Sequence, residues 1–163
     1  MKQLILFRHA KATAHTIGTD WDRALRTSGV QEAEAAGRAL AGTRIDLALI
    51  SNAVRAAQTW HEACAAGATA GREDYVDWLY GVSGRDISLW AAGLDDSLNC
   101  VIVVAHEPGL SDAAFDLAAE TESLDPIASG LPTAAFVVLA HDGPWSTLPG
   151  HAILARFENN RSS

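Results

Sequence analysis

Short apolar runs alternate with segments of helical periodicity along this 163-residue chain, and this alternation constrains its fold more than any other feature. Apolar runs at residues 4–7, 45–50 and 101–105 predict buried strands, and the last is the richest in β-branched residues. Strands that alternate with helices are typical of a parallel sheet covered by helices. We therefore expect an α/β fold: a three-layer α/β/α sandwich with a mostly parallel sheet.

Helical periodicity follows each of the three runs. The first helix, expected over residues 28–40, opens with Ser28 and Gln31 in the positions of an N-terminal capping box. The stretch 67–100 is less regular, and a hairpin near the end of the chain is expected to add an antiparallel edge strand. The other expected elements are helices at 53–66, 87–94 and 108–120 and hairpin strands at 133–140 and 151–157.

The composition limits the partners and the location of the protein. Its 12 Lys and Arg residues and 20 Asp and Glu residues give a net charge of −8 at pH 7, which argues against a nucleic-acid-binding surface. The apolar runs are far shorter than the ~18 residues that span a bilayer, and the first residues lack a signal-peptide pattern. We expect a single cytoplasmic domain over residues 1–163, with no membrane partner.

Basic side chains and histidines gather at the predicted strand ends. Arg8 and His9 directly follow the first strand, and His106 directly follows the third. Arg55 lies in the first turn of the helix after the second strand, and Arg23 lies in the loop after the first. Because ligands of open α/β sheets bind outside the carboxyl ends of the strands, these five residues are candidates for one anion site.

Each of these residues also has an ordinary interpretation. An Arg-His pair at a strand end is common on protein surfaces. Arg55 opposes the positive end of its helix dipole unless it faces water or an anion. The convergence of the five residues on one crevice, rather than any one of them, favours the anion site.

The chain resembles the histidine phosphatase (phosphoglycerate mutase-like) superfamily, and within it the small SixA-type phosphohistidine phosphatases. The resemblance runs nearly end to end, although Asn52 stands where a Pro is more usual. It is carried by Arg8-His9-Ala10, Asp22-Arg23-Ala24-Leu25 with Thr27-Ser28-Gly29, Ser51-Asn52-Ala53-Val54-Arg55-Ala56-Ala57-Gln58-Thr59, Ala105-His106-Glu107-Pro108-Gly109-Leu110, Leu131-Pro132-Thr133-Ala134-Ala135, and Trp145 with Leu148-Pro149-Gly150.

The resemblance implies a phosphatase that passes through a phosphorylated histidine. His9 would attack phosphorus, and water would then hydrolyse the phosphohistidine. Arg8, Arg23 and Arg55 would hold the non-bridging oxygens, and His106 would donate a further hydrogen bond. The implied substrate is a phosphohistidine-bearing protein, with inorganic phosphate as product.

The acid that protonates the leaving group is the least defined part of the implied site. Asp77 and Glu107 are the candidate substrate-side carboxylates, although Asp77 also fits a solvated turn. The segment that would carry the acid is short, which predicts an open crevice that suits a bulky substrate. An imidazole leaving group needs less acid catalysis than an alkoxide, so a phosphohistidine substrate tolerates a missing acid.

No cofactor or metal is expected. The remaining histidines show no metal-ligand spacing, and the two cysteines are too few and too far apart for a zinc site or a disulfide framework. Ser111-Asp112 lies outside any nucleophile-elbow motif. These remaining histidines are His15, His61, His141 and His151.

Two alternatives to a phosphohistidine phosphatase stay open. One is a phosphomonoesterase of the same superfamily that acts on small phosphorylated molecules. The other is a phosphate-binding regulatory module without turnover, against which the presence of both His9 and His106 argues, because binding alone needs no nucleophile.

Overall fold

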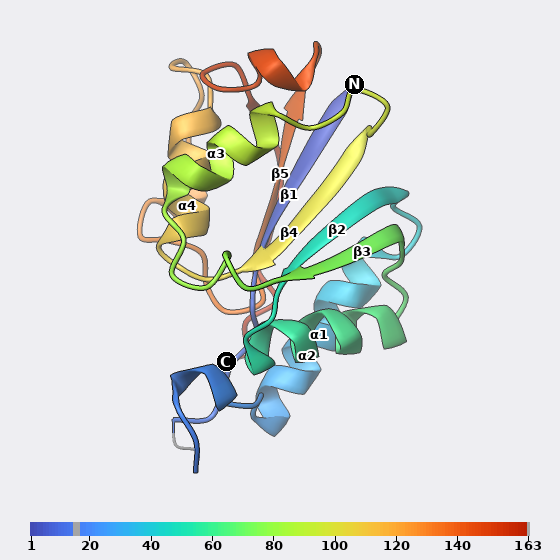
Figure 1. The fold of residues 1–163 in the computed structure, drawn as a ribbon, viewed down its shortest axis with the longest axis vertical. Helices are drawn as coiled ribbons and strands as arrows, with labels where there is room; N and C mark the ends of the chain where they lie inside the picture. Colours follow the sequence, from blue (N-terminus) through green and yellow to red (C-terminus); the bar gives the residue numbers. More distant parts are fainter. Residues whose placement is uncertain (15–16, 163) are drawn as a thin grey trace.

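The computed structural model describes residues 1–14 and 17–162 (Figure 1). Its centre is a six-stranded sheet with the order β3-β2-β4-β1-β5-β6. The strands are β1 (Lys2–Arg8), β2 (Ile45–Ser51), β3 (Ala70–Val76), β4 (Cys100–Ala105), β5 (Phe136–His141) and β6 (Ile153–Glu158).

Most strand pairs are parallel. β1 pairs in parallel with β4, β4 with β2, and β2 with β3. β5 is antiparallel to both β1 and β6. In this register Arg8 lies opposite Ala105, and Ile50 lies opposite Val104, so the carboxyl ends of β1, β4 and β2 are side by side.

Helices cover both faces of the sheet, which confirms the predicted three-layer arrangement. The helices α1 (Thr27–Leu40) and α2 (Val54–Ala65) pack on one face, and α3 (Gly84–Ala92) and α4 (Gly109–Leu117) pack on the other (Figure 1). Three short 3₁₀ helices complete the described elements: η1 (Asp20–Asp22), η2 (Asp125–Ile127) and η3 (Trp145–Thr147).

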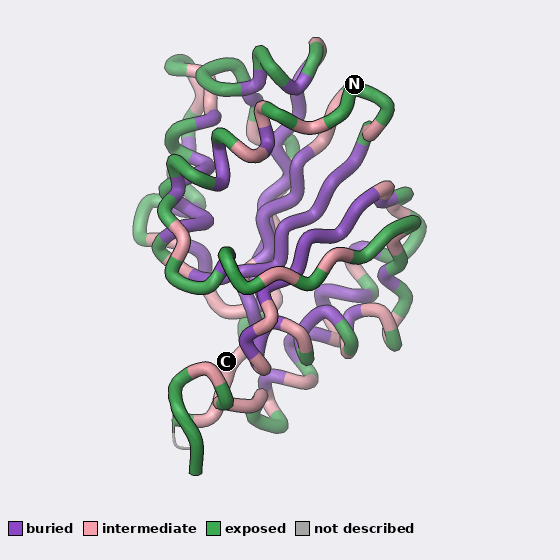
Figure 2. Tube along the Cα trace, viewed as in Figure 1, coloured by how far each residue is buried: buried purple, intermediate pink, exposed green. Residues whose placement is uncertain are grey.

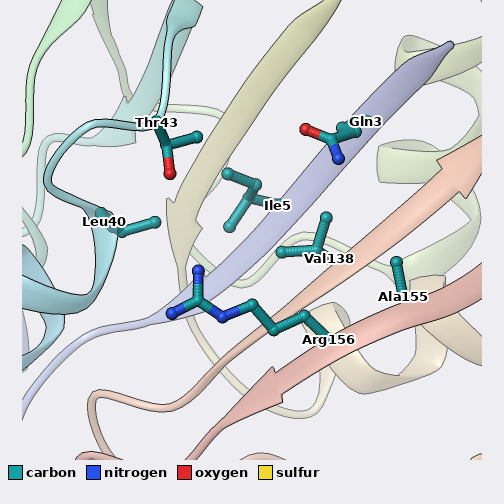
Figure 3. Close-up of a pocket in the computed structure, with 7 residues that line it drawn as sticks. All are labelled: Gln3, Ile5, Leu40, Thr43, Val138, Ala155 and Arg156. Carbon is teal, nitrogen blue, oxygen red and sulfur yellow. The ribbon is translucent and has the colours of Figure 1, made fainter.

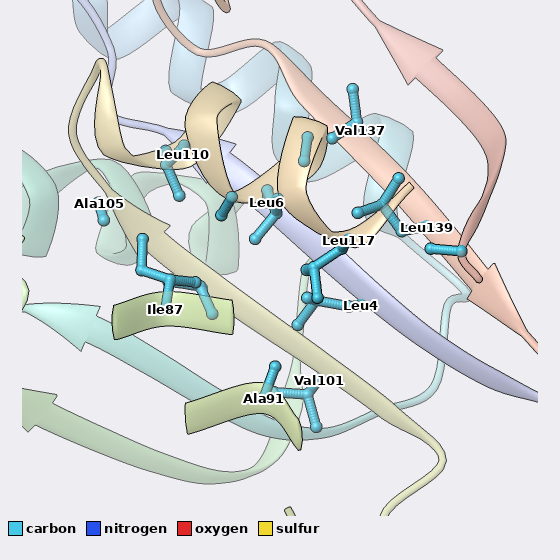
Figure 4. Packing of buried hydrophobic residues seen from close by; sticks show 14 of the residues in the cluster. Leu4, Leu6, Ile87, Ala91, Val101, Ala105, Leu110, Leu117, Val137 and Leu139 are labelled. Carbon is cyan, nitrogen blue, oxygen red and sulfur yellow. The ribbon is translucent and has the colours of Figure 1, made fainter. Parts of the chain in front are cut away.

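Side-chain alternation along β1 supplies both halves of the core. Leu4 and Leu6 pack with α3 and α4 (Figure 4), whereas Ile5 and Phe7 pack with α1 and α2. All four are fully buried, and each such side chain contributes about 2 kcal/mol of hydrophobic stabilisation. The central strands are therefore largely buried, whereas the two edge strands, β3 and β6, are only partly buried (Figure 2).

β3 lies in the less regular stretch 67–100, in which the sequence analysis predicts no strand. Its sequence, AGREDYV, is largely polar, and its burial is only partial because it is an edge strand. The period-2 apolar signal that marks a half-buried strand is therefore absent from it.

The capping box predicted for the first helix is wrong. α1 begins at Thr27 with Arg26 as its N-cap, so Ser28 is already inside the helix. Gly29 explains this placement, because a Cβ there would lie 2.0 Å from the carbonyl oxygen of Lys11. The close approach of α1 to the segment after His9 sets where the helix begins.

Within residues 1–14 and 17–162, every helix is too short or too polar to cross a membrane.

Candidate active site

His9 follows directly on β1 and is held as a neutral imidazole. Its Nδ1 lies 2.8 Å from the carbonyl oxygen of Ala10. A carbonyl only accepts, so Nδ1 carries the proton and Nε2 keeps a free lone pair. Burial lowers the pKa of His9 to about 3, although the Ala10 hydrogen bond acts in the opposite direction. At neutral pH the imidazole is therefore uncharged, and its Nε2 lone pair can act as a nucleophile.

His106 follows directly on β4 and faces His9. The two ring centroids are 5.3 Å apart. His106 Nε2 lies 2.8 Å from the hydroxyl oxygen of Ser51, whereas its Nδ1 is buried without a hydrogen-bond partner in the described part of the chain. Burial, followed by the charge of Arg55, lowers the pKa of His106 to about 4.

Arg8 is the last residue of β1. Its Nη1 donates to the carbonyl oxygen of Leu131 at 2.8 Å, and its Nε is buried with no partner among the described residues. Burial lowers the pKa of Arg8, against the opposing charge of Glu107. Leu131 thus fixes one end of the guanidinium and leaves the other donors available.

Arg55 lies in the first turn of α2 and is only 5% exposed, so it does not face water. Its Nη1 donates to the backbone carbonyl of Asp20 at 2.8 Å, and its Nη2 donates to Oδ2 of Asp20 at 3.0 Å. Its Nε is buried and has no partner in the described residues. Buried at a helix N-terminus, this cation is placed to meet an anion.

Arg23 reaches the same place from the loop before α1. Its Nε donates to Oδ1 of Asp20 at 2.9 Å, and its Nη1 donates to the carbonyl of Thr13 at 2.9 Å. Besides burial, the charges of Arg55, Arg8 and Arg23 each lower the pKa of His106, so all three arginines lie near this ring. All five residues predicted to form the anion site are therefore brought together.

Asp20 and Tyr80 belong to this cluster as well, although the sequence analysis does not identify them as site residues. The carboxylate of Asp20 bridges Arg23 and Arg55, and the Tyr80 hydroxyl donates to it at 2.6 Å. The Tyr80 hydrogen bond is the largest of the effects that lower the pKa of Asp20 to about 2. Asp20 stands three residues before Arg23, a spacing that could have indicated an ion pair. Tyr80 carries no comparable local signal.

Three unpartnered polar atoms mark the centre of the cluster. Arg8 Nε, Arg55 Nε and His106 Nδ1 are buried and make no hydrogen bond within the described residues. A buried polar group without a partner costs about 1–3 kcal/mol. A tetrahedral oxyanion beside His9 would offer these groups acceptors and would neutralise the arginines.

The two candidate carboxylates, Asp77 and Glu107, both accept hydrogen bonds from other parts of the protein. Asp77 accepts a hydrogen bond from Asn52 Nδ2 at 2.7 Å. Glu107 accepts from the backbone N–H of Ser111 at 2.9 Å, from its hydroxyl, and from the backbone N–H of Leu131 at 3.0 Å. Since Leu131 binds Arg8, Glu107 supports the segment that orients this arginine. Neither carboxylate is hydrogen-bonded to an arginine or histidine of the cluster.

Several hollows lie on the described surface, and the largest of them, of about 480 Å³, lies beside Met1, Asp46 and Asn99. One, of about 280 Å³, adjoins the cluster and is lined by His106, Val82, Pro108 and Asp112 among others. Another, of about 220 Å³, lies near the amino end of β1 and is lined by Gln3, Ile5, Leu40, Thr43, Val138, Ala155 and Arg156 (Figure 3). Of these three, only the hollow lined by His106 lies at the carboxyl ends of the strands, where the histidines are.

Within the described residues, no three His, Cys, Asp or Glu side chains are placed to hold a metal ion. His61, His141 and His151 belong to no such group, and His15 lies outside the described residues.

Comparison with known proteins relates the chain to one superfamily. The sequence model of the histidine phosphatase superfamily (branch 1) matches residues 4–77. An uncharacterized protein of Mycobacterium tuberculosis is 32% identical over 158 residues, which span 92% of this chain and 97% of that protein.

Solved structures extend the similarity to the whole fold. A candidate phosphohistidine phosphatase SixA from Nakamurella multipartitia is 29% identical, with a TM-score of 0.82 over 97% of this chain and 95% of that chain. A second candidate SixA, from Agrobacterium tumefaciens, is 29% identical, with a TM-score of 0.77 over 96% and 97% of the two chains. The protein histidine phosphatase SixA complexed with tungstate shares the fold, with a TM-score of 0.82 at 20% identity over 97% of each chain.

Proposed function

The chain belongs to the histidine phosphatase superfamily, and we propose that it hydrolyses phosphohistidine on a protein through a phosphorylated His9. The observation that carries this proposal is the set of buried nitrogens on Arg8, Arg55 and His106 that have no hydrogen-bond partner among the described residues, close to a histidine whose Nδ1 is bound to the carbonyl of Ala10. The likeness to SixA structures over nearly the whole chain supports the choice of substrate.

In the first step, Nε2 of His9 attacks phosphorus in line with the departing nitrogen of the substrate. A new N–P bond forms on His9 while the substrate N–P bond breaks, and the released imidazole takes a proton from solvent. Arg8, Arg23 and Arg55 neutralise the charge on the non-bridging oxygens, and His106 donates a further hydrogen bond to them. The reaction depends on positioning and charge rather than on an acid.

In the second step, water attacks the phosphorus of phospho-His9. The oxygen of water bonds to phosphorus, the N–P bond breaks, and inorganic phosphate leaves with the protons of the water. His9 returns to its neutral form with the proton on Nδ1, because the carbonyl of Ala10 holds that proton in place. No metal ion is needed, since the arginines supply the positive charge.

The hydrogen bonds of the two candidate carboxylates support the choice of an imidazole leaving group. Asp77 and Glu107 are hydrogen-bonded to Asn52, Ser111 and Leu131, and neither is poised as an acid. An imidazole leaves with less help than an alkoxide. The site is therefore better suited to phosphohistidine than to phosphate esters.

The test is a comparison of substrates on the purified protein. We expect kcat/KM for a phosphohistidine-bearing protein to exceed that for p-nitrophenyl phosphate and for a panel of sugar phosphates. His9→Asn keeps a donor near Ala10 but lacks the nucleophile and should abolish turnover, whereas His61→Asn, at an exposed position of α2, should not. A sugar phosphate as the best substrate would favour the small-molecule phosphomonoesterase. Phosphate binding without turnover would favour the regulatory module.

A further inference from the structure

Ser51 connects the end of β2 to His106. Its side chain is fully buried, and its hydroxyl oxygen lies 2.8 Å from Nε2 of His106. The same oxygen accepts a hydrogen bond from the backbone N–H of Ala53, just before α2, at 3.2 Å. The hydroxyl is therefore placed by the backbone on one side and contacts the imidazole on the other.

The hydrogen atoms of the Ser51 hydroxyl and the His106 ring can be arranged in two ways. An N–H only donates, so the contact with Ala53 uses a lone pair of the Ser51 oxygen and leaves its single hydrogen free. If that hydrogen points to His106 Nε2, the neutral ring carries its proton on Nδ1. If Nε2 carries the proton instead, the Ser51 oxygen accepts twice and its hydrogen has no acceptor among the hydrogen bonds of the described residues.

Burial decides between the two arrangements. An unused hydroxyl hydrogen in a fully buried position costs free energy. With the proton on Nδ1, the Ser51 hydroxyl and Nε2 are both satisfied, and the unpartnered atom of His106 becomes an N–H donor. That donor lies in the cluster that holds Arg8 and Arg55, whose charges favour an anion there.

We infer that Ser51 is a positioning residue that fixes His106 in the Nδ1–H tautomer and so makes it a hydrogen-bond donor to the bound phosphoryl group. The role of His106 in turnover rests on the proposed function, whereas its tautomer does not. Ser51 itself does not touch the substrate; it acts through His106.

The tautomer is measured directly by long-range ¹⁵N–¹H correlation spectra of the ¹⁵N-labelled protein at neutral pH. We expect His106 to show a protonated Nδ1 and an unprotonated Nε2. In Ser51→Ala the Nε2 loses its donor, and the signals should move away from this pattern. Ser51→Thr keeps a hydroxyl and should restore it. Ser88→Ala removes another buried serine hydroxyl, outside the cluster, and should leave the His106 signals unchanged.

The kinetic consequence is a loss of kcat. Removal of one preorganised donor to an oxyanion lowers kcat by about 100-fold. We expect kcat to fall by up to about 100-fold in Ser51→Ala, with a much smaller change in KM. Ser51→Thr should recover most of the rate, and Ser88→Ala should match the unmodified protein.

A protonated Nε2 on His106 in the unmodified protein overturns the inference, whether or not Ser51→Ala folds. So does an Nδ1–H pattern that persists in folded Ser51→Ala. If the expected tautomer is found but no phosphohistidine substrate is turned over, the proposed function fails and the structural role of Ser51 stands.

Discussion

Asp20 accepts two hydrogen bonds from Arg55, one on its backbone carbonyl and one on its carboxylate. The same carboxylate also binds Arg23 and Tyr80. An internal anion thus pairs with two of the three arginines that are proposed to hold the phosphoryl group, and it offsets part of their charge. It keeps their side chains in place when no substrate is bound, and it lowers the positive potential that attracts one.

Asp20→Asn removes the negative charge beside the arginines. The amide oxygen still accepts hydrogen bonds, whereas the NH2 group replaces one of the two accepting oxygens of the carboxylate. We expect inorganic phosphate to inhibit several-fold more strongly, because removal of a partly exposed charge beside the site is worth up to about 1 kcal/mol. The measurement is the inhibition constant of phosphate at fixed ionic strength.

Asp22→Asn is the matched control for this change. Asp22 lies in the same 3₁₀ helix, η1, but its carboxylate binds Thr19 rather than an arginine. Its loss should alter phosphate inhibition much less. Equal effects of the two variants would show that only the net charge of the segment matters.

Arg55→Lys tests the guanidinium itself. Lysine keeps the charge but does not reproduce the paired hydrogen bonds to Asp20 together with the Nε donor. We expect kcat/KM to fall by about 100-fold, with a melting temperature that drops by only a few degrees. Arg38→Lys, at an exposed position of α1, should change neither quantity. A large drop in melting temperature with an unchanged rate would make Arg55 a structural residue.

The pH dependence of kcat/KM follows from burial of the two histidines. Their pKa values are lowered to about 3 for His9 and about 4 for His106, from an ordinary value of 6.5. Both rings therefore stay neutral at pH 6, and the acidic loss of kcat/KM should lie below about pH 5. A half-loss near pH 6.5, with circular dichroism showing a folded protein, would contradict this assignment.

The lowered pKa values of the two histidines also make the free energy of unfolding rise with pH. The unfolded chain binds more protons than the folded protein between the lowered pKa values and 6.5. The contribution of these histidines is fully present above pH 6.5 and is lost as the pH falls toward about 4. Melting temperatures across this range should fall less steeply in His106→Asn.

The fold and most of the site could be predicted because their signals are local. Apolar runs give β1, β2 and β4, and the basic residues and histidines at their ends follow in sequence. β3 gives no such signal, because an edge strand needs little apolar surface. Tyr80 contacts Asp20 across sixty positions of the chain, and only the packing of the loop after β3 brings them together.

The start of α1 shows a different limit. Ser28 and Gln31 fit a capping box, but Gly29 must pack on the backbone of Lys11. This tertiary contact overrides the local preference. A sequence pattern does not contain it.

Chelation tests whether the positive charge at the phosphoryl group comes from the arginines or from a metal ion. In the proposed mechanism, Arg8, Arg23 and Arg55 supply the positive charge that a metal ion supplies in other phosphoryl-transfer enzymes. We expect kcat with a phosphohistidine substrate to be unchanged after dialysis against EDTA. Activity that disappears on chelation and returns with a divalent ion would refute this prediction.

The central claim is that His9 becomes phosphorylated during turnover. Rapid quenching with a ³²P-labelled phosphohistidine protein should trap a label on the enzyme that is stable in base, labile in acid and located on His9 by peptide mapping. His61→Asn should carry the same label, and His9→Asn should carry none. An acid-stable label, or one that persists in His9→Asn, would contradict the account.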